Sequence, residues 1–113
     1  MKNQRKSFRL KEPLAVVRCS VKYLLERNAL SQDISENGIC ILTPYKMDIG
    51  ETVELGIYVP ESKTPILATG EVVRRNETNN PEFPFIVGIK FAKISPKSKN
   101  QIFNHIRFYL LQK

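Results

Sequence analysis

The stretch TVELGIYV, residues 52–59, alternates apolar with other side chains along its whole length. Val53, Leu55, Ile57 and Val59 fall on one face of an extended chain, because successive side chains of a strand point to opposite sides. This spacing predicts a β-strand with one buried and one solvated face. The rest of the fold can be worked outward from it.

Similar segments occur on both sides of residues 52–59 and predict five further strands: 14–25, 29–34, 39–43, 66–75 and 85–91. Polar or proline-containing stretches separate them, and Glu26-Arg27-Asn28 is expected to form the turn between the first two. Gly70 is expected to permit a sharp bend or a close backbone approach within its strand. Six short strands with regular turns predict an all-β protein, a six-stranded antiparallel barrel that is closed or nearly closed.

The hydrophobic period changes near the carboxyl end of the chain. Ser95 is a suitable helix cap and Pro96 suits the first helical position, so a terminal α-helix is predicted over about 95–112. The apolar stripe expected to face the barrel consists of Ile102, Phe103, Ile106, Tyr109 and Leu110. Phe108 and Leu111 lie off this stripe and leave a second contact surface open, so the protein is expected to be a monomer or a homodimer.

The chain has 113 residues, 42% of them hydrophobic and 26% charged, which suits one domain with a single modest core. No apolar run approaches the 18 or so residues that span a membrane. The basic amino terminus lacks the apolar segment of a secretory signal, so a cytoplasmic location without membrane insertion is expected. The net charge of +7 favours an anionic partner such as nucleic acid, a nucleotide or an acidic protein surface.

The sequence offers no visible apparatus for catalysis. His105 is the only histidine, and its place off the apolar stripe predicts an exposed, structural side chain. Cys19 and Cys40 fall in apolar strands without metal-ligand spacing, so each is expected to be a buried small hydrophobe, with no disulfide. The sequence lacks a glycine-rich phosphate loop and a cluster of metal ligands. We therefore expect a protein that is not an enzyme and carries no metal or cofactor.

Two short motifs offer binding chemistry. Arg5 and Arg9 are spaced Arg-x-x-x-Arg in residues 1–12, a basic stretch expected to be a mobile arm ahead of a single barrel domain over 13–113. An arginine fork can grip phosphate or the O6/N7 edge of guanine through two hydrogen bonds. The second motif is the turn Asp33-x-Ser35-x-x-Gly38, in which a carboxylate can accept from guanine, a hydroxyl can donate to phosphate or cap the turn, and glycine permits close approach.

Together these motifs make the chain similar to the PilZ domain family, bacterial receptors for cyclic di-GMP. The family pattern is Arg-x-x-x-Arg followed by Asp/Asn-x-Ser-x-x-Gly, and Val87-Gly-Ile-Lys-Phe91 is similar to its late Gly-x-x-Phe strand. The resemblance covers nearly the whole chain and implies a PilZ-type barrel with a terminal helix. It also implies that Arg5 and Arg9 contact guanine and phosphate, and that Asp33, Ser35 and Gly38 line the opposing wall.

Several further residues are weaker candidates for the same ligand. Asn37 lies within the turn, and either Arg74 or Arg75, near the end of the fifth strand, could add a phosphate or stacking contact. Of these two arginines, Arg75 is included among the predicted site residues. Family members with a basic residue just before the arm motif resemble binders of a stacked ligand dimer, whereas this chain has Gln4 there. The stoichiometry therefore stays open.

Three functions remain open from the sequence. The favoured one is a non-enzymatic cyclic di-GMP receptor whose arm closes on the ligand and signals to an unidentified protein partner. A second is a basic barrel that binds single-stranded nucleic acid, with Phe8, Phe83 and Tyr58 as stacking platforms; it is disfavoured because most phenylalanines occupy core positions. A third is a PilZ-like adaptor that acts by protein contact independently of nucleotide.

Overall fold

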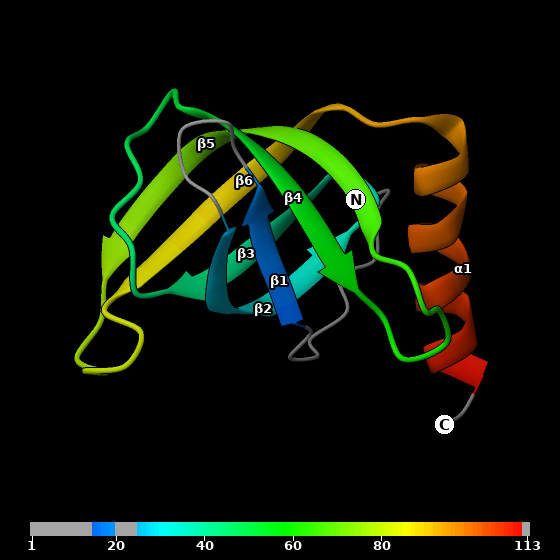
Figure 1. Cartoon of the computed structure of the whole chain (residues 1–113), viewed down its shortest axis with the longest axis horizontal. Helices are drawn as coiled ribbons and strands as arrows, with labels where there is room; N and C mark the ends of the chain where they lie inside the picture. The colour runs from blue at the N-terminus through cyan, green and yellow to red at the C-terminus, as the bar shows by residue number, and fades with distance from the viewer. Residues whose placement is uncertain (1–14, 20–24, 112–113) are drawn as a thin grey trace, which may run out of the picture.

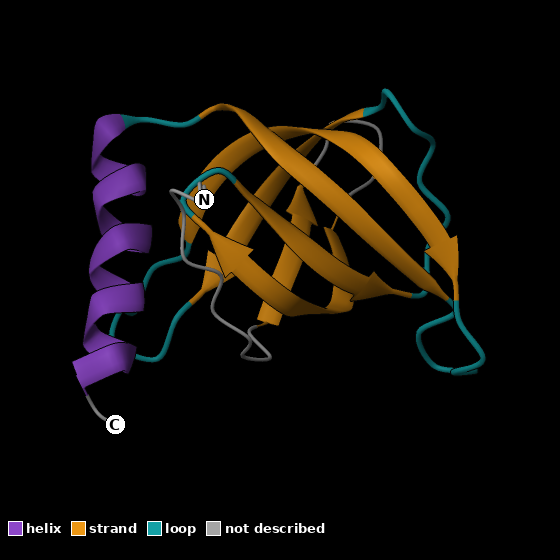
Figure 2. Ribbon diagram, turned by 180° about the vertical axis from the view of Figure 1, so that it is seen from behind, coloured by secondary structure: helices purple, strands orange, loops and turns teal. Residues whose placement is uncertain are grey.

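The computed structural model describes residues 15–19 and 25–111, and the side chains of residues 29–108 (Figure 1). Its elements in chain order are β1 (Ala15–Cys19), β2 (Leu25–Ser35), β3 (Gly38–Thr43), β4 (Thr52–Tyr58), β5 (Ile66–Glu77), β6 (Phe85–Lys93) and α1 (Pro96–Leu111). The six strands form a closed antiparallel barrel in the order β1-β2-β3-β6-β5-β4. The helix stands beside one end of the barrel, as the opposite views in Figures 1 and 2 both show. The predicted all-β barrel with a terminal helix is confirmed.

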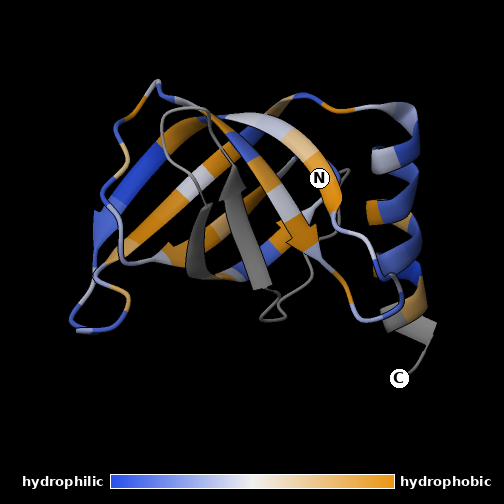
Figure 3. Ribbon diagram, in the orientation of Figure 1, coloured by the Kyte–Doolittle hydropathy of each residue, from blue (hydrophilic) through white to orange (hydrophobic). Residues whose placement is uncertain are grey.

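The barrel interior is filled by the faces that the sequence predicted. Val53, Leu55 and Ile57 are buried along β4, and the alternate residues of β5 from Ile66 to Val72 are buried as well. The colour changes along these strands in Figure 3 follow this alternation. Apolar side chains of β2, β3 and β6 complete one continuous core. Because β4 and β5 bury mainly one face, their outer side is left mostly for polar side chains.

The turn predicted at residues 26–28 is wrong. These residues belong to β2, where Glu26 pairs with Arg18 and Leu25 pairs with Cys19 of β1. Residues 20–24, which lie between the two strands in the sequence, are outside the described residues. Polar residues are tolerated in a strand that has a solvated face, so a short polar run does not by itself mark a turn.

Two β-bulges interrupt the pairing of β5 with β6, one between Thr69 and Gly70 and one between Val72 and Arg74. At the first, a Cβ added to Gly70 would lie 2.4 Å from Ile89 Cγ2 and 2.9 Å from the Lys90 carbonyl oxygen. The predicted close approach at Gly70 is thus confirmed. Bulges bend a strand and change which side chains face outward beyond them.

The loop over residues 44–51 closes one end of the barrel. Met47 of this loop is fully buried in the core. The loop also pairs with Val72 of β5, whose carbonyl accepts from Gly50 N at 2.7 Å and whose N–H donates to the Glu51 carbonyl at 2.9 Å. This extra pairing occupies β5 just before its second bulge. The loop therefore holds β5 in place just before the second bulge, where its pairing with β6 is shifted.

The helix begins as predicted and buries only part of the predicted face, including Ile102 and Ile106. Ser95 Oγ accepts a hydrogen bond from Ser98 N at 3.0 Å, which makes Ser95 the cap. Ser98, Ile102, His105 and Ile106 are buried, whereas Phe103 is 47% exposed, so the predicted stripe is wrong at Phe103. The side chains of Tyr109, Leu110 and Leu111 lie outside the described residues. Phe108, placed off the stripe, is exposed.

His105 is not the exposed residue that the sequence predicted. It is 2% exposed, and its Nδ1 lies 2.5 Å from Glu61 Oε2 in the loop between β4 and β5. A polar ring can be buried when a partner satisfies it, and that partner lies 44 residues away in the sequence. The contact ties the middle of α1 to the barrel.

Within residues 15–19 and 25–111, no helix is long and apolar enough to cross a membrane.

Candidate functional site

The turn between β2 and β3 contains three of the predicted site residues and is held by its own hydrogen bonds. Ser35, which is almost fully buried, accepts from Asn37 N through Oγ at 3.3 Å, and the same hydroxyl lies 3.5 Å from the Gly38 carbonyl. The Asn37 carbonyl in turn accepts from Phe91 N at 2.9 Å. Ser35 thus caps the turn, which is one of the two roles predicted for it. The hydrogen bond from Phe91 N also holds the turn against β6.

Gly38 is required by the barrel itself. A Cβ at this position would lie 2.4 Å from the Ile89 carbonyl oxygen and 3.3 Å from Lys90 Cα, both backbone atoms of β6. Such a distance is too short for any side chain, and the backbone of a closed barrel cannot easily move away. The glycine of the motif therefore allows β3 and β6 to approach closely, which brings the turn against the β6 strand.

Beside this turn a row of residues crosses four neighbouring strands on the outer wall. Asp33 of β2 pairs with Cys40 of β3, Cys40 pairs with Gly88 of β6, and Gly88 pairs with Arg74 of β5. Paired residues of antiparallel strands share one face, and adjacent strands are about 4.8 Å apart, so Asp33 and Arg74 mark the ends of a row roughly 14 Å long. A carboxylate and a guanidinium thus lie on one surface although 41 positions separate them.

Arg74 lies flat over Gly88 in a shallow depression of about 190 Å³, whose lining also includes Gly38, Cys40 and Lys90. A Cβ on Gly88 would lie 3.2 Å from Arg74 Cζ and 3.3 Å from its Nη2. Arg74 Nη2 donates to Cys40 Sγ at 3.7 Å, and the Cys40 thiol contacts Gln32 Oε1 at 3.5 Å. Because sulfur contacts are weak, the guanidinium retains donors for a ligand placed over the depression.

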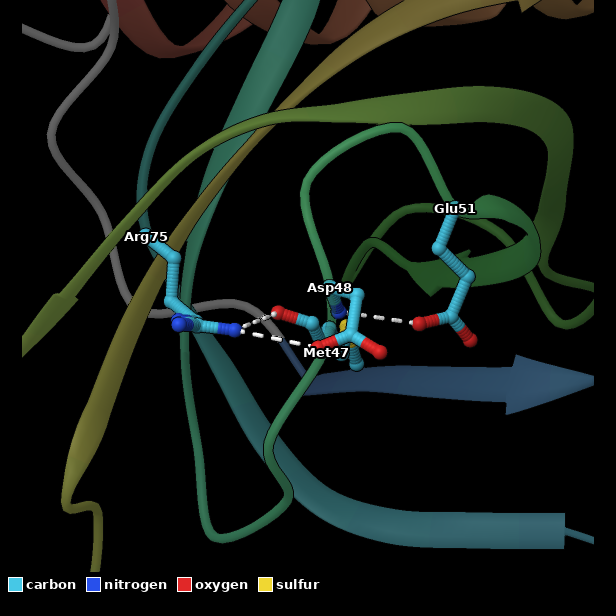
Figure 4. A network of polar contacts seen from close by, with 4 residues as sticks. All are labelled: Met47, Asp48, Glu51 and Arg75. Carbon is cyan, nitrogen blue, oxygen red and sulfur yellow. Dashed lines mark hydrogen bonds and ion pairs between the residues drawn. The ribbon is translucent and has the colours of Figure 1, made fainter.

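Arg75 points to a different part of the molecule. Its Nη1 donates to the Met47 carbonyl at 3.1 Å and to Asp48 Oδ1 at 3.2 Å, while Asp48 N donates to Glu51 Oε1 at 3.0 Å (Figure 4). Arg75 pairs with Val87, whose side chain is fully buried, so it lies on the inner face at the end of the barrel. The bulge between Val72 and Arg74 is the cause, since it turns Arg74 outward and Arg75 inward.

The structure therefore brings together Asp33, Ser35, Asn37 and Gly38, and it does not bring Arg75 to them. Arg5, Arg9 and Gln4 lie outside the described residues, as does the whole predicted arm over 1–12. Of the three aromatic platforms considered for nucleic acid, Phe8 also lies outside, Phe83 is partly buried and Tyr58 is 41% exposed. The part of the chain described here contains no group of three His, Cys, Asp or Glu side chains that could hold a metal ion.

Reasoning from the sequence missed the roles of Cys40, Gly88 and Lys90 on this wall. Cys40 was expected only to be a buried hydrophobe, and it is indeed buried and in no disulfide, but its thiol faces the arginine rather than the core. Gly88 was considered only as part of the Gly-x-x-Phe strand that the chain shares with the family. The missing information was the cross-strand register, because only pairing places Gly88 between Cys40 and Arg74.

Comparison with known proteins identifies the fold and the family. The model of the PilZ domain matches residues 3–108 of the sequence. The chain belongs to the PilZ family. The match covers the positions of both motifs, so the resemblance inferred from Arg5, Arg9 and the Asp33–Gly38 turn is confirmed at the level of the family. No curated protein matches the sequence.

Solved PilZ structures share this barrel at low sequence identity. The chain matches the Bacillus subtilis inhibitor of motility (MotI/DgrA) with a TM-score of 0.78 and 20% identity, covering 99% of this chain and 54% of that one. It matches the PilZ domain of Escherichia coli YcgR, solved with c-di-GMP, with a TM-score of 0.66 and 18% identity over 97% of this chain and 93% of that chain. The chain thus spans about half of MotI/DgrA. At these identities the similarity is one of fold.

Proposed function

We propose that this protein is a non-enzymatic receptor for cyclic di-GMP, bound on the outer wall of the barrel over β2, β3, β6 and β5. The observation that carries the proposal is the anchored Asp33–Gly38 turn, which lies beside a depression that Arg74 crosses. Membership of the PilZ family and the c-di-GMP complex of the YcgR PilZ domain support the choice of ligand.

In this proposal the described residues form one half of the site. Asp33 would accept from the N1–H and N2–H₂ edge of a guanine, while Arg74 would offer its fork to phosphate or its flat face to a base. Ser35 and Gly38 act mainly by positioning the backbone of the turn: the Ser35 hydroxyl caps it, and Gly38 lets it lie against β6. Asn37, which is exposed and lines the depression, would contact the ligand edge.

Arg5 and Arg9 would supply the other half from the amino-terminal segment. When both contact one ligand, the segment is held over the wall, and the surface that a partner protein meets there is changed. The contacts must offset the entropy lost by ordering the segment. Signalling would then require a partner or self-association, since binding itself changes no covalent bond.

The test is calorimetric titration of the full chain with cyclic di-GMP. Arg5→Ala and Arg9→Ala are each expected to weaken binding at least about tenfold, the loss of one charge-assisted contact of roughly 1.4 kcal/mol. Arg107→Ala, which removes an equal charge from the exposed side of α1, is the matched control and should bind as the wild type does. Absence of binding heat with the wild type, or unchanged affinity in both arm variants, would refute the receptor.

Binding experiments with the same wild-type and variant proteins distinguish the receptor from the two alternative functions. A nucleic-acid-binding barrel would bind single-stranded oligonucleotides with a steep salt dependence and little response to Asp33→Ala. A nucleotide-independent adaptor would bind its protein partner equally well with and without cyclic di-GMP. Neither outcome is expected from the receptor.

A further inference from the structure

A groove of about 850 Å³ lies where β5, the end of β6 and the start of α1 meet, away from the Asp33–Arg74 row. Leu67 and Arg74 are seven residues apart along β5, so the groove and the row are separated by roughly 20 Å. The largest exposed apolar side chain of the groove is Leu67, which is 61% exposed. No role in cyclic di-GMP binding uses this region.

The groove is bordered by a length of β5 that lacks a strand neighbour on one side. The pairing of β5 with β6 begins at Thr69, opposite Lys93, where β6 ends. Ile66, Leu67 and Ala68 pair with β4 on their other side but, within the part of the chain that the structure describes, with no strand on the β6 side. An unpaired strand edge is a template for an added strand.

The charge of the groove is of one sign. Its charged lining residues are Lys93 and Lys97, and no aspartate or glutamate lines it. Lys97 and Lys99 lie in the first turn of α1, which contains no acidic residue, so the positive end of the helix dipole is left without a compensating carboxylate. Ser98 lines the groove at 7% exposure, and its hydroxyl makes no hydrogen bond to the described residues.

We infer that this groove binds an extended acidic segment of a partner protein, added as a short strand along Ile66–Ala68. Main-chain hydrogen bonds to the β5 edge would hold the segment, and its alternate side chains would place carboxylates near Lys93 and Lys97 and apolar groups against Leu67. Alternate residues of a strand direct their N–H and C=O groups to opposite sides, and Leu67 is exposed between the buried Ile66 and Ala68, so Leu67 offers the backbone groups for this pairing. The amino-terminal segment of this chain is a poor occupant, because residues 1–12 are themselves basic.

This inference does not rest on the proposed nucleotide function, so its test uses the full chain with and without cyclic di-GMP. The probes are three synthetic six-residue peptide pools with alternating apolar positions: one with Glu, one with Gln and one with Lys at the other positions. Binding is followed by amide chemical shifts of the ¹⁵N-labelled protein. The Glu pool is expected to bind about tenfold more tightly than the Gln pool and to shift amides within 66–69 and 92–98, while the Lys pool does not bind.

The double variant Lys93→Glu/Lys97→Glu should lose at least about tenfold in affinity for the Glu pool, as expected when two attractive contacts become repulsive. Lys46→Glu/Arg107→Glu carries the same change in net charge at exposed positions outside the groove and should keep the affinity. If the first variant does not fold, Lys93→Gln/Lys97→Gln replaces it, with an expected loss of about fourfold. Equal binding of the Glu and Gln pools, shifts confined to other residues, or no loss in the groove variant would overturn the inference. Shifts that grow with protein concentration alone would overturn it in favour of a second copy of this chain.

Discussion

The two ends of the β5–β6 strand pair are built in opposite ways. Near Arg74 the backbones of β3 and β6 approach so closely that Gly38 has no room for a side chain, and the Arg74 side chain lies directly over Gly88. Near Leu67, β6 has ended and β5 runs on without it, leaving an open groove beside α1. One end is a tight wall that presents side chains, and the other exposes a backbone edge.

This difference follows from where the bulges and strand ends fall. The bulge between Val72 and Arg74 turns an arginine outward at the tight end, and the bulge between Thr69 and Gly70 occurs where β6 is about to leave β5. A single strand pair can thus serve two surfaces with different chemistry. The following variants test whether the two ends differ in the way described.

The largest effect is expected from Gly38→Ala. The new methyl group would lie 2.4 Å from the Ile89 carbonyl oxygen, so the backbone of β6 must shift, and we expect a loss of about 3 kcal/mol in the free energy of unfolding. Gly56→Ala is the control toward the open end, because its methyl would meet only Pro65 Cβ at 3.3 Å and other side-chain atoms, and it should cost less than about 1 kcal/mol. Urea denaturation measures both, and equal losses would remove the distinction between the ends.

His105→Ala is expected to cost about 2 kcal/mol in the free energy of unfolding. The substitution leaves a cavity under α1 and removes the contact between Nδ1 and Glu61. Asn104→Ala, at the neighbouring exposed position of the helix, should cost less than about 0.5 kcal/mol. Since His105 and its partner Glu61 both lie outside the four strands of the Asp33–Arg74 row, affinity for cyclic di-GMP should stay unchanged in both variants. A weakened affinity in His105→Ala alone would mean that the helix and the ligand wall are coupled.

The strand pattern made most of this fold predictable from the sequence. Burial on one face of β4 and β5 follows directly from period-two alternation, and Ser95-Pro96 marked the start of the helix. His105 was misjudged because its burial depends on Glu61, a partner that no local pattern reveals. The turn at 26–28 was misplaced because polar residues occur both in turns and on the outer face of strands.

The Asp33–Gly38 motif of the site could be predicted from the sequence, whereas the neighbouring outer wall with Arg74 could not. Asp33, Ser35 and Gly38 are close in sequence, so their turn could be recognised directly. Arg74 could not be distinguished from Arg75, since unbroken alternation from the buried Val72 would place Arg74 inward and Arg75 outward. The bulge reverses this assignment. The bulge follows Val72, which also pairs with residues 50 and 51, and these contacts join segments that are distant in the sequence and meet only on folding.

Arg74→Ala and Arg75→Ala therefore form a discriminating pair. Removal of Arg74 is expected to weaken cyclic di-GMP binding about tenfold, or roughly 1.4 kcal/mol, with little change in stability, because this exposed side chain contacts mainly Cys40 and Gly88. Removal of Arg75 is expected to leave affinity unchanged and to lower the free energy of unfolding by about 1 kcal/mol, through loss of its bond to the Met47 carbonyl. Titration calorimetry and urea denaturation separate the two outcomes. The reverse assignment would place Arg75, not Arg74, at the ligand.

Asp48→Asn should give the smallest effect. Its carboxylate accepts from Arg75 Nη1 at 3.2 Å, but the Asp48 side chain is 81% exposed and that of Arg75 is 30% exposed, so water and salt screen the attraction. We expect a loss below about 0.5 kcal/mol in the free energy of unfolding. A double-mutant cycle with Arg75→Ala measures the coupling, and a value above about 1 kcal/mol would contradict the screened pair. A small coupling would show that Arg75 stabilises this end of the barrel mainly through the Met47 carbonyl, and that the tight end of β5 depends on backbone contacts rather than on charge.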